Sequence, residues 1–174
     1  MAGQVHLATP SMEWREEYMA FYQEWKQSGE RIVPWIVDKD PTDFAAYVRF
    51  LQDESLGANL RPGWVATSTY WLVNEQGKIA GAVNIRHGLT DKLLETGGHI
   101  GYGVVPSQRR KGYATQILAQ SLQKARELGI TRVLVTCDRG NAGSEKTIVK
   151  NSGVFESEFI EADGNVVRRF WIEL

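Results

Sequence analysis

The feature that most constrains this chain is a strand that leads through a cationic turn into a long amphipathic helix. Residues 101–114 read GYGVVPSQRRKGYA. Backbone N–H groups at a helix start have no partner within the helix and lie at the positive end of its dipole, so they can bind an anion. Gly112 lets the backbone approach such a ligand because it has no Cβ. Three neighbouring cations oppose the dipole and need a compensating anion, so the pattern predicts a phosphate-binding turn at Arg109, Arg110, Lys111, Gly112 and Ala114.

The bulk composition narrows the class of protein. A chain of 174 residues that is 43% hydrophobic and 24% charged is typical of one globular domain, so we expect a single domain over residues 1–174. The net charge of −1 makes the basic cluster a local feature and argues against nucleic-acid or membrane partners. The single cysteine, Cys137, excludes an internal disulfide. With no membrane-length apolar stretch and no signal-peptide core, we expect a cytoplasmic protein.

Hydrophobic periodicity and turn signals predict an alternating order of strands and helices. Asp40-Pro41 is predicted to start the second helix as N-cap and first helical residue, and Ser11 is the predicted N-cap of the first. The expected strands cover 5–8, 67–73, 79–86, 99–104, 133–137, 155–161 and 166–172, and the expected helices 12–27, 41–57, 109–128 and 142–151. The run of three strands suggests an antiparallel meander. The unit from 99 to 137 should be a right-handed parallel crossover, which gives a mixed sheet.

One family shares this order of elements together with a motif. The residues Arg109-x-x-Gly112-x-Ala114 directly after a strand fit the pattern Gln/Arg-x-x-Gly-x-Gly/Ala, and Asn141 follows the next strand. On these grounds the chain resembles the GCN5-related N-acetyltransferases (GNAT) over nearly its whole length. The stretches 97–102 and 168–171 are also similar to a bacterial subfamily of predicted acetyltransferases without an assigned substrate. The resemblance implies an α/β (α+β) fold: a mixed, mostly antiparallel twisted sheet with a splayed parallel strand pair, and helices on both faces.

The resemblance also implies a function, a co-substrate and a set of contacts. The expected activity is direct transfer of the acetyl group of acetyl-CoA to an amine, without a metal. A non-catalytic acyl-CoA sensor is the alternative, and a homodimer is a candidate assembly. The acceptor stays open among polyamines, antibiotics, amino acids, peptide N-termini and protein lysines. The pantetheine arm is expected between 102–104 and 131–137. The implied cofactor-binding residues are Tyr102, Gly103, Val104, Arg109, Arg110, Lys111, Gly112, Tyr113, Ala114, Asn141 and Ser144.

Two glycines in one strand support such a ligand from the residues themselves. Period-two alternation places His99, Gly101 and Gly103 on the same face of their strand. Two glycines on one face weaken a strand and add nothing to a packed core. Room for a ligand against the backbone would explain them. A β-bulge or a crowded helix crossing is the alternative.

The catalytic groups are less well defined. In the family a Tyr seven residues after the Asn often acts as general acid, but here that position is Ile148. Tyr102 is therefore a candidate proton donor, with Tyr113 as a second choice. His99 is a candidate general base because histidine titrates near neutral pH, although a structural role is an alternative for His99 and for His87. No His/Cys/Asp/Glu spacing indicates a metal site.

The acceptor side offers only weak signals. Glu54, Asp38 and Asp40 lie in or near the helical region expected to cover it and could bind a cationic substrate, although solvated carboxylates are the simpler interpretation. Trp35 and Trp64 flank the second helix and could line an acceptor pocket. Large aromatic residues more often fill cores.

Overall fold

The computed structural model describes residues 4–174. Its strands and helices alternate much as the periodicity predicts. In chain order they are β1 (His6–Ala8), α1 (Arg15–Ser28), α2 (Phe44–Leu56), β2 (Thr67–Val73), β3 (Ile79–Arg86), β4 (Ile100–Val104), α3 (Tyr113–Glu127), β5 (Arg132–Asp138), α4 (Ala142–Lys150), β6 (Val154–Ile160) and β7 (Val166–Glu173). Short helical turns lie at Met12–Trp14, Trp35–Val37, Leu93–Gly97 and Pro106–Gln108.

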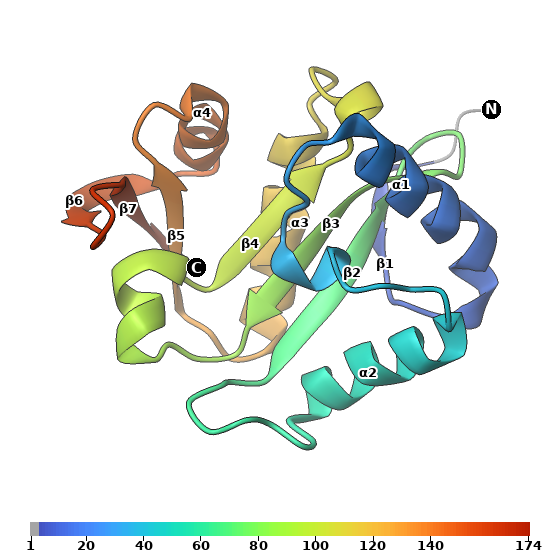
Figure 1. Cartoon of the computed structure of the whole chain (residues 1–174). Helices are drawn as coiled ribbons and strands as arrows, with labels where there is room; N and C mark the ends of the chain where they lie inside the picture. The colour runs from blue at the N-terminus through green and yellow to red at the C-terminus, as the bar shows by residue number, and fades with distance from the viewer. Residues whose placement is uncertain (1–3) are drawn as a thin grey trace.

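The strands form two antiparallel sheets. The first has the order β1-β2-β3-β4 and the second the order β5-β7-β6. The two sheets meet where β4 and β5 begin: the N–H of His99 donates to the carbonyl of Leu134 over 2.8 Å. Beyond this bond β4 and β5 run the same way and diverge, as Figure 1 shows. The predicted mixed α/β fold with antiparallel strands and a splayed strand pair is therefore confirmed.

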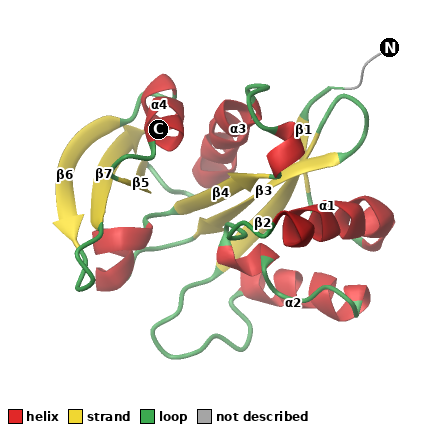
Figure 2. Ribbon diagram, turned by 45° about the horizontal axis from the view of Figure 1, so that its top comes forward, coloured by secondary structure: helices red, strands yellow, loops and turns green. Residues whose placement is uncertain are grey.

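Helices cover both faces of the first sheet (Figure 2). On one face α3 packs against β3 and β4, and its buried side chains include Ile117, Leu118 and Ala125. On the other face α1 and α2 bury an aromatic cluster in which the Tyr18 and Trp71 rings lie 4.5 Å apart between centroids. Two apolar cores thus fix the sheet from both sides, and the end of β4 lies between them.

The predicted start of the second helix is wrong for a local reason. Helix α2 begins at Phe44, because the side chain of Asp43 caps it by accepting from the N–H of Ala46 over 3.0 Å. Asp40 instead closes the preceding turn by accepting from the N–H of Thr42 over 2.9 Å. An aspartate can serve either role, so the sequence pattern did not separate the two.

The start of α3 was also predicted too early. Arg109 and the two residues after it belong to the turn, and the helix begins at Tyr113. Arg110 has a φ of 64° and Gly112 a φ of 82°, and neither value fits a right-handed helix. Ser11 precedes a short 3₁₀ turn and makes no side-chain cap, so α1 proper begins at Arg15.

Candidate functional site

A cleft of about 840 Å³ lies between the end of β4, the 108–112 turn, the first turn of α3, and α4. Its lining includes every predicted cofactor-binding residue except Lys111, whose Nζ donates to Gln108 Oε1 over 3.2 Å. Sequence reasoning missed several further lining residues. They are Trp25, Val33, Gln108, Thr115, Ala142, Gly143, Lys146, Thr147 and Lys150.

The first turn of α3 leaves its backbone N–H groups without a side-chain cap. Gly112 is its N-cap, no side chain caps it, and the turn contains no acidic residue. Its free N–H groups therefore remain available to a ligand. A Cβ at Gly112 would meet no protein atom within 4 Å. The backbone is thus open on the side where a phosphate would approach.

The cations of the cleft differ in how they are held. Arg109 forms an ion pair with Glu30 over 2.7 Å, and its Nε donates to the carbonyl of Val104 over 3.0 Å, so it braces the end of β4. Lys146 and Lys150 lie one turn apart on α4, and no ion pair within residues 4–174 involves either of them. Their i, i+4 spacing was visible in the sequence, and it could have placed them on one helix face.

The opposite wall of the cleft is α4. Asn141 caps this helix as predicted, because its Oδ1 accepts from the N–H of Ser144 over 3.1 Å. The hydroxyl of Ser144 in turn lies 3.1 Å from the hydroxyl of Tyr102. A side-chain hydrogen bond therefore links β4 to the first turn of α4.

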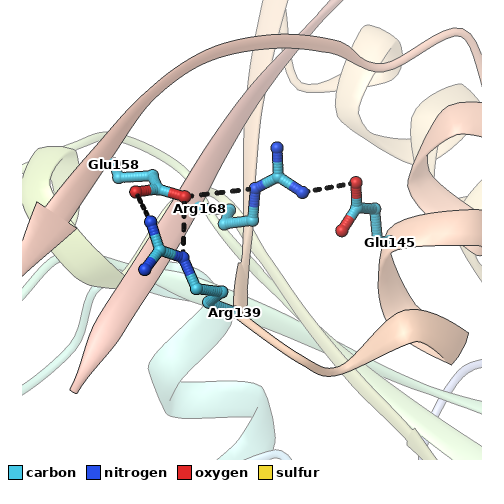
Figure 3. Close-up of polar contacts among 4 residues, drawn as sticks. All are labelled: Arg139, Glu145, Glu158 and Arg168. Carbon is cyan, nitrogen blue, oxygen red and sulfur yellow. Dashed lines mark hydrogen bonds and ion pairs between the residues drawn. The ribbon is translucent and has the colours of Figure 1, made fainter.

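A chain of ion pairs holds α4 to the second sheet (Figure 3). Arg168 on β7 contacts Glu145 on α4 over 2.6 Å and Glu158 on β6 over 3.6 Å. Glu158 also pairs with Arg139, which lies in the loop before α4. Because Glu145 directly follows Ser144, this network positions the cleft wall.

Tyr102 is suited to donate a proton. Burial raises the pKa of its phenol, although hydrogen bonds from Ser144 and Thr147 partly oppose that shift. The phenol is therefore protonated at neutral pH. Ile148, at the position where the family often has Tyr, is fully buried and packs against Gly153. Tyr113 also lines the cleft, but its hydroxyl donates to Glu75 Oε2 over 2.6 Å, whereas the Tyr102 hydroxyl contacts Ser144 on α4.

The outer edge of β4 offers backbone donors. The N–H of Val105 donates to the carbonyl of Ala80 on β3 over 3.0 Å. Hydrogen-bonding directions alternate along an antiparallel strand, so the N–H groups of Tyr102 and Val104 point away from β3. Since β5 has diverged at this point, they face the cleft and can donate to a developing oxyanion.

His99 is not among the residues that line the cleft, so the structure favours its structural role over that of a general base. Its Nδ1 accepts from the N–H of Leu134 over 2.9 Å, which fixes the junction of the two sheets. Burial and the nearby charge of Arg86 lower the pKa of His99 to about 4. His87 is likewise held in place, because its Nε2 lies 2.8 Å from the hydroxyl of Ser68.

Gly101 and Gly103 share a strand face as predicted, but the protein itself fills the space beside Gly103. A Cβ at Gly103 would lie 2.2 Å from the carbonyl oxygen of Val33 and 2.7 Å from the ring of Trp25. A Cβ at Gly101 would lie 3.5 Å from Pro34. Close packing of Val33 explains Gly103, whereas a Cβ at Gly101 would make an ordinary van der Waals contact. The β3–β4 register continues without a bulge through both.

The acceptor-side candidates divide into two groups. Asp38 pairs with Lys26 and Asp40 is bonded within its own turn, so both are satisfied on the surface. Trp35 and Trp64 contact each other edge to face, with ring centroids 5.3 Å apart. Together with Glu54 they line a second cavity of about 470 Å³ beside α2. Burial raises the pKa of Glu54, whose Oε2 has no hydrogen-bond partner among residues 4–174.

Other chemistries find little support in the described part of the chain. Within residues 4–174, no group of three His, Cys, Asp or Glu side chains could hold a metal. Burial raises the pKa of Cys137 to about 11, which disfavours a nucleophilic thiolate. Among the helices described, none is both long and apolar enough to cross a bilayer.

Comparison with known structures supports the fold. The microcin C7 self-immunity acetyltransferase MccE, solved with acetyl-CoA and AMP, has a TM-score of 0.67 at 18% identity, covering 98% of this chain and 93% of MccE. RimL, a ribosomal L7/L12 α-N-protein acetyltransferase solved with coenzyme A, has a TM-score of 0.71 at 15% identity over 99% and 96% of the two chains. A dodecameric spermidine N-acetyltransferase from Vibrio cholerae has a TM-score of 0.66 at 12% identity over 98% and 94%.

These distantly related structures show the fold alone. A family model assigns the chain to a family. No curated protein sequence matches the chain. The model of the acetyltransferase (GNAT) domain, however, matches residues 11–153. That span includes the 108–112 turn, the first turn of α3 and the whole of α4, which together form most of the cleft. The chain therefore belongs to the GNAT acetyltransferase family.

Proposed function

We propose that the chain binds acetyl-CoA in this cleft and transfers its acetyl group directly to an amine. The observation that carries the proposal is the uncapped first turn of α3, which opens onto the same cleft as the outer edge of β4. The first turn of α3 suits a pyrophosphate, and the outer edge of β4 suits a thioester. The acetyl-CoA and coenzyme A bound to MccE and RimL support the same co-substrate.

Each part of the cleft has a separate task in this proposal. The N–H groups of the first turn of α3, with Arg110, Lys146 and Lys150, bind the phosphates. The N–H groups of Tyr102 and Val104 donate to the thioester oxygen as negative charge develops on it. The amine nitrogen forms the new C–N bond while the C–S bond breaks. Tyr102 protonates the departing thiolate, and the proton lost by the amine passes to water.

This assignment refines the expected catalytic pair. Tyr102 is kept as the proton donor because it lines the cleft and bonds to Ser144. His99 is not kept as the base, because its Nδ1 is occupied by the N–H of Leu134 and its pKa lies far below neutral. Water at the cleft mouth takes the proton instead. This suits an acceptor amine of which a fraction is already unprotonated when it binds.

A sensor without catalysis is the second candidate, favoured by the buried Ile148 at the usual Tyr position. Two measurements separate it from the enzyme. Calorimetry reports acetyl-CoA affinity, and a thiol-release assay with a panel of primary amines reports turnover. We expect acetyl-CoA binding and amine-dependent thiol release. Tight binding with no release for any amine would support the sensor, and absence of binding would exclude both.

We further infer that the whole chain acts as one unit in the cytoplasm and that it self-associates. The residues that line the cleft are drawn from Trp25 to Lys150, which is most of the chain. Strand β6 is an edge strand with exposed apolar residues, among them Val154 and Ile160, each 68% exposed. The dodecamer of the spermidine acetyltransferase is a precedent for assembly. Light scattering after size-exclusion chromatography tests this inference, and a monomer at all concentrations would contradict it.

A further inference from the structure

The face of the first sheet that lies under α1 and α2 changes from apolar to charged along its strands. Three cross-strand rows follow one another on this face, given by the register of β2, β3 and β4. The first row is apolar, the second is mixed and the third carries a cation. In order they are Trp71–Ala82–Gly103, Thr69–Asn84–Gly101 and Thr67–Arg86–His99.

Arg86 is a cation without a counter-ion. Its Nη1 donates to the carbonyl oxygens of Gly97 and Gly98 over 3.0 and 3.1 Å. Among the described residues, no carboxylate pairs with it and no acceptor binds its Nε or Nη2. Burial alone lowers its pKa, with no nearby acid to oppose the shift. A largely buried, unpaired cation is costly, and a ligand anion would compensate it.

The row beside Arg86 holds a second unsatisfied group. The Asn84 side chain is fully buried, and its Nδ2 donates to Thr69 Oγ1 over 3.0 Å. Its Oδ1 accepts from no donor in the described structure, and neither does the buried Oγ1 of Thr67. Buried polar atoms are nearly always paired, so such orphans point to a missing partner that carries N–H or O–H groups.

These groups lie next to the reaction cleft. The guanidinium Nη2 of Arg86 is 3.8 Å from the place where a Cβ of Gly101 would stand. Gly103, two residues further along β4, lines the cleft together with Val33. Two residues of a strand span about 7 Å, which is within the length of a small amino acid. His99 stays neutral at physiological pH, so it does not compete with Arg86 for an anion.

We propose that the free donors of Arg86 bind a carboxylate of the acceptor, so that the acceptor is a primary amine that also carries an anionic group. A guanidinium suits a carboxylate because it presents planar, paired N–H donors. The inference rests on the proposed acetyl transfer and narrows its substrate class. It also separates this chain from polyamine acceptors, which carry no anion.

The first experiment compares amino acids with their amides at several chain lengths. Glycine, β-alanine and 4-aminobutyrate are each assayed beside the matching carboxamide, with the wild type, Arg86→Met and Arg126→Met. Arg126 is a matched control, since it lies in the last turn of α3 and bonds only to Gln123. For at least one length we expect the acid to exceed its amide about tenfold in kcat/KM, as a charge-assisted hydrogen bond predicts. Arg86→Met should abolish that preference by lowering the acid rate far more than the amide rate.

Two results would overturn the proposal. One is a wild type that shows no preference for the acid at any length. The other is an Arg86→Met variant that lowers acid and amide rates equally, because Arg86 would then only hold the Gly97 and Gly98 carbonyls. Arg86→Lys keeps the charge, so partial retention of the preference is expected if Arg86→Met fails to fold.

A binding measurement separates this inference from acetyl transfer itself. Arginine side-chain NMR of the wild type, saturated with acetyl-CoA, is followed while propionate or propionamide is added. A saturable shift of one Nε–H signal with propionate alone, absent in Arg86→Lys, supports the carboxylate site even if no amine is acetylated. No shift with propionate contradicts the site, whatever the outcome of the thiol-release assay.

Discussion

The hydroxyl of Tyr102 lies 3.1 Å from the hydroxyl of Ser144, and this contact joins β4 to α4 across the cleft. It places a protonated phenol beside the helix in which the family often supplies a Tyr. Ile148, which stands at that family position, is fully buried. The contact therefore suggests that the chain takes its proton donor, Tyr102, from strand β4 instead of from α4.

Replacing Tyr102 by Phe tests that role. We expect kcat for thiol release to fall by about a hundredfold, the lower end of general acid contributions, with a small change in KM for acetyl-CoA. Ser144→Ala is the matched control, because it removes the same hydrogen bond and keeps the phenol. Equal rates for Tyr102→Phe and the wild type would show that water protonates the thiolate.

Gly112 and Gly129 form a matched pair at the two ends of α3. Both have φ near 80°, and a Cβ at either would meet no atom within 4 Å. Gly112→Leu and Gly129→Leu should each lower the free energy of unfolding by about 1–2 kcal/mol, because a left-handed backbone is strained for any residue with a Cβ. Only Gly112→Leu should abolish acetyl-CoA binding in calorimetry. Unchanged affinity in Gly112→Leu would contradict the assignment of the cleft.

Arg168 tests whether the ion-pair network positions the cofactor wall. Arg168→Met leaves Glu145 without its 2.6 Å partner and frees the first turn of α4. We expect KM for acetyl-CoA to rise by about three- to tenfold, with a smaller effect on kcat, because misplaced binding groups weaken contacts to the ligand. Arg132→Met is the control: it removes an exposed pair with Glu173 at the start of β5. Equal effects of both variants would argue against a positioning role.

His99 makes stability depend on pH. Its pKa is about 4 in the folded chain and near 6.5 when unfolded, so the unfolded state binds the proton first. The stabilisation is complete above pH 6.5 and is lost as pH falls toward 4, by about 3 kcal/mol at most. Urea unfolding at pH 7.5 and pH 4.5 measures this loss. His99→Asn keeps an acceptor for the N–H of Leu134 and should show a clearly smaller change; an equal change would assign it to other groups.

The features predicted from the sequence are those coded by neighbours in the chain. The hairpin around Gly77, the cap at Asn141 and the glycine stop at Gly29 each depend on a few adjacent residues, and the structure shows all three. Helix starts were less certain, since Asp40 and Asp43 carry the same capping chemistry only three residues apart. The turn at Arg110 and Gly112 needed backbone angles that a pattern does not reveal.

By itself the sequence determined the α/β order of elements and the presence of a cationic, glycine-containing turn before α3, because both follow from periodicity and short-range chemistry. Only the tertiary structure decided what the residues of β4 contact. Gly103 packs on Val33, seventy residues earlier, and His99 bonds to Leu134, thirty-five residues later. The unpaired state of Arg86 and the position of α4 against the cleft, opposite β4 and α3, are likewise properties of the folded chain. Such contacts join residues far apart in the chain, and no local pattern encodes which of them will meet.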